Sequence, residues 1–163
     1  LELHDLLESD NFAVDSVSTG EQALEAAAAR PPDLLLTDLG LGTGMDGLEL
    51  CRRFKELGSH PNTPILVLTA GRPGSKLGAF DAGAEDYLTA PVNPTLLQAR
   101  VNACLIKKAL ADTEKEKAQE LAKIQQRLEA ALQSIDVGFA IFDQESRLVM
   151  MNQTFSFLYP TNF

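Results

Sequence analysis

Three short apolar runs, each closed by residues that favour turns, most constrain what this chain can fold into. They are Leu34–Thr37, Ile65–Thr69 and Asp86–Thr89. Apolar runs of this length predict strands that are buried on both faces of a sheet. Because helix-prone stretches separate them, the chain reads as βα units, which form a parallel sheet covered by helices. The sequence therefore predicts an α/β fold.

The segments between and before these runs predict helices and one more strand. The first residues have the leucine spacing of a helix, whereas Phe12–Val17 alternates between apolar and polar residues as a strand does. Ser18 and Glu21 match a capping box at the start of the next helix. The predicted helices here are residues 21–30, 47–57 and 74–82, the last of them weak because it is rich in glycine.

Asp38 is the leading candidate for chemistry because of its place after a buried strand. It stands at the carboxyl end of the strand predicted at Leu34–Thr37 and precedes the glycine-rich loop 39–44. In open α/β sheets this edge is where ligands bind, and a carboxylate there can accept a phosphoryl group as a nucleophile. The loop glycines also allow a phosphate or flavin cradle, although no GxGxxG spacing precedes a helix.

Composition and charge argue against several classes of function. The net charge of −9 argues against a nucleic-acid surface, because neutralising phosphates requires clustered Lys and Arg. Cys51, Cys104, His4 and His60 are isolated, so they indicate neither a disulfide framework nor a histidine metal site. No signal peptide and no apolar stretch long enough to span a membrane occurs. We therefore expect a cytoplasmic segment that contacts neither nucleic acid nor membrane.

Three motifs together resemble the receiver domain of two-component response regulators. They are PDLLLTDLGLGTGMDGLELCRRFK, TPILVLTA and GAEDYLTAP, in the family's order and at strand ends. The resemblance covers residues 1–108 and implies a flavodoxin-like, doubly wound parallel sheet of strand order 2-1-3-4-5. It implies that a histidine kinase or phosphotransfer protein phosphorylates Asp38, that Thr69 contacts the phosphoryl group, and that Tyr87 is the aromatic switch residue. Mg²⁺ would be ligated by Asp38 and the backbone carbonyl of Gly40.

The chain departs from the family pattern in three places. The family's first strand, which ends in an acidic pair, has no counterpart. We expect it to lie upstream of Leu1 or to come from a swapped neighbouring chain. Ala90 stands where the family has a lysine that pairs with the phosphoryl group, so switching should be weaker or atypical. The loop between Asp38 and Asp46 is one residue longer than the common pattern, which is ordinary loop variation.

A helix without proline or glycine is predicted from Thr95 to Ser134. It would be about 60 Å long, which is longer than a receiver's last helix needs to be. Its later part has a 3-4 spacing of apolar residues, which predicts the seam of a parallel dimer. The seam residues are Leu121, Ile124, Leu128, Ala131 and Ile135. The alternative is an amphipathic helix that packs on its own domain.

The last residues resemble the opening of a PAS sensor domain. The strings GFAIFD and RLVMMN read as two strands joined by residues 144–146, and a helix containing Phe155 follows. The expected organisation is a receiver domain lacking its first strand at 1–108, a helical coiled-coil linker at 109–134, and the first part of a PAS-like α+β domain at 135–163.

These patterns predict a phosphorylation switch rather than an enzyme. A phosphoryl group on Asp38 would send a signal through a dimeric helix to the PAS and output region. The alternative is a degenerate receiver acting as a phosphorylation-independent dimerisation or docking scaffold. Ala90 favours the scaffold, whereas Asp38, Thr69 and Tyr87 oppose it. A flavin or nucleotide binder is the third interpretation, and it predicts a bound chromophore.

Overall fold

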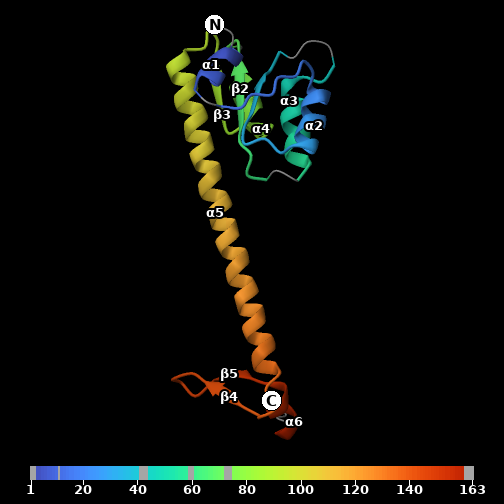
Figure 1. Cartoon of the computed structure of the whole chain (residues 1–163), viewed down its shortest axis with the longest axis vertical. Helices are drawn as coiled ribbons and strands as arrows, with labels where there is room; N and C mark the ends of the chain where they lie inside the picture. Colours follow the sequence, from blue (N-terminus) through green and yellow to red (C-terminus); the bar gives the residue numbers. More distant parts are fainter. Residues whose placement is uncertain (1–2, 11, 41–43, 59–60, 72–74, 160–163) are drawn as a thin grey trace. The chain divides into compact units, whose positions relative to one another are not determined.

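The computed structural model describes residues 3–10, 12–40, 44–58, 61–71 and 75–159 (Figure 1). The chain divides into two compact units, Leu1–Asp112 and Thr113–Phe163. Of the residues singled out in the sequence, His60, Gly74 and the loop residues 41–43 lie outside the described part. None of the helices among the described residues combines the length and the apolarity that a membrane crossing needs.

A parallel sheet of three strands forms the centre of the first unit, in the order β1-β2-β3. The strands are β1 (Leu35–Asp38), β2 (Ile65–Thr69) and β3 (Asp86–Thr89). On the central strand, Ile65 and Val67 pack into one core and Leu66 into the other, and all three are fully buried. Successive side chains of a strand point to opposite faces. The sheet is therefore covered on both sides, which confirms the predicted α/β class.

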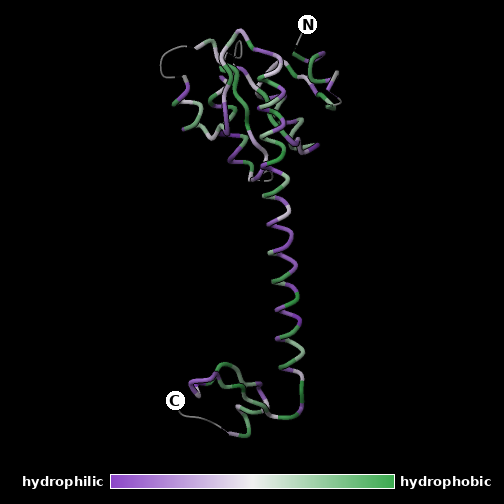
Figure 2. The backbone as a smooth tube through the Cα atoms, turned by 90° about the vertical axis from the view of Figure 1, so that its left-hand side faces the viewer, coloured by the Kyte–Doolittle hydropathy of each residue, from purple (hydrophilic) through white to green (hydrophobic). Residues whose placement is uncertain are grey.

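Helices enclose the two cores. One core is covered by α2 (Gly20–Ala29), α3 (Gly47–Glu56) and α4 (Ser75–Asp81), the other by α1 (Leu3–Ser9) and α5 (Pro94–Gln133). Cys51 and Phe54 are buried in the first core, and Leu97 and Val101 in the second. Figure 1 shows α1 and α5 across the sheet from α2 and α3. Figure 2 shows hydrophobic residues concentrated on the strands of this unit.

The strand predicted at Phe12–Val17 is wrong. The apolar alternation is real, since Phe12 and Val14 are partly buried against the second core and Ala13 is exposed. A strand, however, exists only where its backbone groups pair with a neighbouring strand. Among the described residues no ladder includes this segment, so its burial pattern alone does not make it a strand.

Two helix ends also differ from the prediction. The N-cap of α2 is Thr19 rather than Ser18, and its hydroxyl accepts the backbone N–H of Gln22 at 3.2 Å. The Gln22 side chain returns a bond to the N–H of Ser18, so the reciprocal cap is shifted by one residue from Ser18 and Glu21. Helix α5 is unbroken, as predicted, but it ends at Gln133. Ile135, the last predicted seam residue, therefore lies beyond the helix.

The second unit contains an antiparallel hairpin followed by a short helix. Its elements are the later part of α5, β4 (Ala140–Phe142), β5 (Leu148–Met151) and α6 (Gln153–Leu158). Asn152 is fully buried at its centre. The Asn152 side chain accepts the N–H groups of Phe139 and Phe155, both at 3.0 Å, and donates to the carbonyls of Ile135 and Val137 at 3.1 and 2.9 Å. One amide thus satisfies four backbone groups of this unit.

Candidate functional site

The candidate site lies where the parallel strands of the first unit end. Asp38 is the last residue of β1, and Thr69 is the last residue of the neighbouring β2. Asp38 is paired in register with Leu68, next to Thr69, and the following N–H of Leu39 donates to the Leu68 carbonyl at 3.1 Å. The structure therefore brings the predicted carboxylate and hydroxyl to adjacent strand ends at one edge of the sheet.

The backbone around Asp38 is held in place by its own loop and by helix α3. Asp38 is exposed, and its Oδ1 atom accepts the N–H of Gly40 at 3.1 Å. Gly47, the first residue of α3, donates its N–H to the carbonyl of Leu39 at 3.3 Å. A Cβ atom on Gly47 would lie 2.3 Å from the Asp38 carbonyl oxygen and 2.8 Å from Leu39 Cα. The helix can approach this closely only because residue 47 has no side chain.

Thr69 is buried beside the exposed Asp38. The residue is only 3% exposed, and its hydroxyl oxygen accepts the N–H of Gly71 at 3.2 Å. Its carbonyl accepts the N–H of Ala90 at 2.8 Å, which extends the β2–β3 ladder past the end of β3. The methyl side chain of Ala90 is exposed and carries no charge to this edge of the sheet.

Tyr87 belongs to the face of the sheet that α4 covers. Its ring meets Phe80 edge-on, with 5.7 Å between centroids and planes at 84°. The ammonium of Lys76 lies 4.8 Å from the centre of the Tyr87 ring, a distance suited to a cation–π contact. Tyr87 is partly buried and packs against the first core. The structure places it between α4 and the sheet, one strand away from the one that carries Thr69.

The donors available for Mg²⁺ at this edge are few. Among the described residues no group of three or more His, Cys, Asp or Glu side chains converges on one point. Asp38 offers one exposed carboxylate, and Gly40 offers its backbone carbonyl. Mg²⁺ accepts one or two carboxylates together with waters and phosphate oxygens. This partial donor set fits Mg²⁺ when water and a phosphoryl group complete the octahedron.

Helix α2 contacts the far end of the loop that follows Asp38. Gly20 lies against Met45, because an added Cβ would be 2.9 Å from the Met45 sulfur. The backbone N–H of Glu21 donates a hydrogen bond to the carboxyl group of the same residue, and this bond holds the pKa of that carboxyl below its usual range. Hydrogen bonds from the Thr19 hydroxyl and the Met45 N–H lower this pKa further. Beside them is an open hollow of about 460 Å³, which Arg52 and other charged residues line. Asp38 and Thr69 do not line this hollow.

Sequence reasoning located Asp38 and Thr69 but missed the residues that support them. The contact of Gly47 with Asp38 has only one local signal, the Asp46-Gly47 pair that marks a helix start. Asp46 is indeed the N-cap, and it accepts the N–H of Glu49 at 2.7 Å. The contact between Gly20 and Met45 joins separate segments and has no local signal in the sequence.

Comparison with known proteins identifies relatives of the first unit. A family model described as "Response regulator receiver domain" matches residues 2–102. Transcriptional regulatory protein ResD of Bacillus subtilis is 37% identical over 100 residues, which cover 61% of this chain and 40% of ResD. KDP operon transcriptional regulatory protein KdpE of Escherichia coli is 39% identical over 104 residues, which cover 63% of this chain and 44% of KdpE.

A solved structure supports the same fold. The crystal structure of a putative response regulator from Chloroflexus aurantiacus superposes with a TM-score of 0.61 at 36% sequence identity, and the match covers 64% of this chain and 85% of that one. The chain spans less than half the length of ResD and KdpE. These matches therefore concern the first unit and leave the rest of those relatives without a counterpart here.

Proposed function

The chain belongs to the response regulator receiver family over residues 2–102, and from this membership we propose that it is a phosphorylation switch with Asp38 as the acceptor. The observation that carries the proposal is the position of an exposed carboxylate, that of Asp38, and a buried hydroxyl, that of Thr69, at the ends of two neighbouring parallel strands. The donor is a histidine kinase or a phosphotransfer protein. The reaction is phosphoryl transfer to the protein itself, so the unit acts as a switch rather than as an enzyme with turnover.

In the proposed reaction, a carboxylate oxygen of Asp38 attacks the phosphorus of a phosphohistidine. The P–N bond breaks, its electron pair returns to the imidazole, and an acyl phosphate forms on Asp38. The Thr69 hydroxyl donates a hydrogen bond to a phosphoryl oxygen and draws its loop inward. Asp38 and the Gly40 carbonyl would hold Mg²⁺, which would neutralise charge on the transferred group. Tyr87 then repacks between α4 and the sheet as the switch residue.

Signal transmission is proposed to run along α5. Leu121, Ile124 and Leu128 are 66, 52 and 58% exposed in the single chain, so their apolar faces are available to a second copy of this helix. A parallel dimer through these residues and Ala131 would carry the signal into the second unit, which we propose to be the beginning of a PAS domain. Supporting this, β4, β5 and α6 follow each other as expected for such a domain.

Ala90 favours a second candidate function. Without a lysine at this position, the phosphoryl group has no partner there to hold the switched state, and the side chain present is an exposed methyl group. The second candidate is a degenerate receiver that serves as a phosphorylation-independent dimerisation or docking scaffold. Both candidates place the chain in the cytoplasm. That it contacts no nucleic acid stays a prediction based on the net charge of −9, since the curated relatives are named transcriptional regulators.

Phosphorylation is tested by treating the protein with acetyl phosphate and Mg²⁺ and measuring its intact mass. We expect one phosphoryl group to be added to the wild type and none to Asp38→Asn, because that variant keeps the shape of the side chain but has no nucleophilic carboxylate. Asp81→Asn, at an exposed position of α4, is the matched control and should be phosphorylated normally. A wild type that gains no mass and keeps its assembly state would support the scaffold instead.

The dimer seam is tested by light scattering. Leu121→Glu with Leu128→Glu should convert a dimer to a monomer, because it places four carboxylates in the apolar seam of the dimer. Gln119→Glu with Gln126→Glu adds the same charge to the opposite face of α5, where both residues are exposed, and it should leave the dimer intact. A monomeric wild type, or a seam variant that stays dimeric, would contradict the proposed seam.

A further inference from the structure

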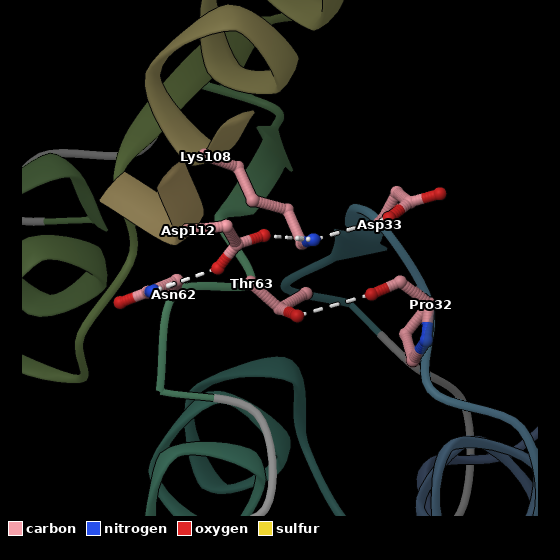
Figure 3. A network of polar contacts seen from close by, with 6 residues as sticks. All are labelled: Pro32, Asp33, Asn62, Thr63, Lys108 and Asp112. Atoms are coloured by element: carbon pink, nitrogen blue, oxygen red, sulfur yellow. Dashed lines mark hydrogen bonds and ion pairs between the residues drawn. The ribbon is translucent and has the colours of Figure 1, made fainter. Parts of the chain in front are cut away.

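A polar network lies at the amino edge of the sheet, opposite the candidate site (Figure 3). Lys108 on α5 places its ammonium 3.1 Å from Asp33 Oδ1 and 2.7 Å from Asp112 Oδ2. Asn62 donates from Nδ2 to the other oxygen of Asp112 at 2.7 Å. Asp33 precedes β1 and Asn62 precedes β2. Helix α5 is thus bonded to the segments that precede β1 and β2. The candidate site lies at the opposite, C-terminal ends of these two strands.

The two segments that precede β1 and β2 are also bonded to each other. The hydroxyl of Thr63 donates to the carbonyl of Pro32 at 3.0 Å, and the N–H of Leu35 donates to the carbonyl of Pro64, also at 3.0 Å. Lys55 on α3 donates to the Thr63 carbonyl at 3.0 Å. Thr63 is only 3% exposed. The segments before β1 and β2 therefore form one body, to which Lys108 and Asp112 attach α5.

Apolar docking of α5 ends before this network. Leu97, Val101 and Cys104 are buried, whereas Ile106 and Leu110 are each 63% exposed. After Cys104, the contacts of α5 with the rest of the first unit are mainly polar. Lys107 pairs with Glu85, but its side chain is 71% exposed, so solvent screens that pair. The Lys108 side chain is only 19% exposed.

The bonds of Lys108 are charge-assisted. The hydrogen bond to Asp112 raises the pKa of Lys108, and burial opposes the increase only in part, so the ammonium stays charged. A charge-assisted bond is about twice as strong as a neutral one. The two bonds of Lys108 differ, because Asp33 is 82% exposed whereas Asp112 is held on both sides by Lys108 and Asn62. Asp112 is therefore the centre of the network.

We propose that Lys108, Asp112, Asp33 and Asn62 form a latch that holds residues 106–112 of α5 against the sheet of the first unit. While the latch is closed, residues 106–112 are held against Asp33 and Asn62, which precede β1 and β2. When it opens, this part of the helix is free to bend or fray away from the sheet, although the apolar docking of Leu97 and Val101 persists. The latch depends on contacts within the resting protein and not on phosphorylation of Asp38.

Hydrogen exchange on the full chain tests the latch without any phosphoryl donor. Lys108→Ala should raise the exchange rates of the backbone amides of residues 106–112 by about tenfold, as expected for loss of the charge-assisted bond to Asp112 together with the more exposed bond to Asp33. Exchange in β1 and β2 should not change. Lys115→Ala, an exposed lysine farther along the same helix, should leave the exchange rates at wild-type values. Equal rates in Lys108→Ala and wild type would overturn the proposal.

Two further variants separate the latch from ordinary helix stability. Asn62→Ala removes a partner outside α5 and should also raise exchange in residues 106–112, although less than Lys108→Ala. The double variant Lys108→Asp with Asp112→Lys keeps an ion pair within the helix but turns a carboxylate towards Asp33. We expect it to exchange as fast as Lys108→Ala. Wild-type protection in either variant would show that the pair within the helix acts alone, which would overturn the proposal.

Discussion

Replacing Gly47 with alanine is expected to destabilise the first unit by about 3 kcal/mol or more. The added Cβ would stand 2.3 Å from the Asp38 carbonyl oxygen and 2.8 Å from Leu39 Cα. Both neighbours are backbone atoms, so no side chain can turn away to relieve the overlap. Either α3 moves outward or the end of β1 shifts. The urea midpoint followed by circular dichroism should fall strongly, and phosphorylation of Asp38 should fall with it.

Gly78→Ala is the matched control for this substitution. Gly78 lies inside α4, and a Cβ there would meet Leu48 Cδ1 at 3.5 Å, an ordinary contact. Alanine should stabilise this helix by about 0.5–1 kcal/mol relative to glycine. Opposite signs for the two substitutions would identify the close approach, rather than glycine flexibility, as the cause. A Gly47→Ala protein as stable as wild type would contradict the contact between α3 and β1.

Changing Asn152 to aspartate is expected to unfold the second unit. The substitution preserves size but replaces an amide group that donates to the carbonyls of Ile135 and Val137 by a carboxylate oxygen that repels them. It also places a charge at a position that is 0% exposed. Breaking a buried polar network in this way costs about 3–5 kcal/mol. Hydrogen exchange should lose protection over residues 135–158 and keep it over β1 and β2.

The control is the same substitution at an exposed site. Asn102→Asp lies on the outer face of α5 and should leave protection unchanged in both units. If the Asn152→Asp protein retained wild-type protection over residues 135–158, the four bonds of this side chain would not be what organises the hairpin.

The elements that could be predicted from sequence are those whose type follows from the residues of the segment itself. Ile65–Thr69 is almost continuously buried, and its apolar run alone identified it as a buried strand. The unbroken α5 follows from the absence of proline and glycine after its first residue, Pro94. Phe12–Val17 had the correct alternation and still failed as a strand, because strand formation depends on a partner that the segment's own residues do not determine.

The residues of the candidate site likewise include some that the sequence predicted and some that only the structure revealed. Asp38 was a candidate because ligands bind at the carboxyl edge of a parallel sheet. Thr69 was a candidate only through the resemblance to receiver domains, and the structure places it at the end of the neighbouring strand. The role of Gly47 could not be predicted, since it acts through the backbone of Asp38 and Leu39. The same holds outside the site for Asn152 and Lys108, whose partners include residues remote in sequence. The pair formed by Lys108 and Asp112 has helical spacing and is readable as such. The bond of Asp112 to Asn62, in contrast, connects two segments that only the fold brings together.

The division of the first unit into two cores sets an order in which they can form during synthesis. The buried residues of the core under α2, α3 and α4 all lie between Ala27 and Ala84, whereas the opposite core joins Leu7 to Leu97 and Val101. The first core can therefore close while α5 is still inside the ribosome. The second must wait for the start of α5 to emerge, and until then one face of the sheet remains open to chaperones and to aggregation.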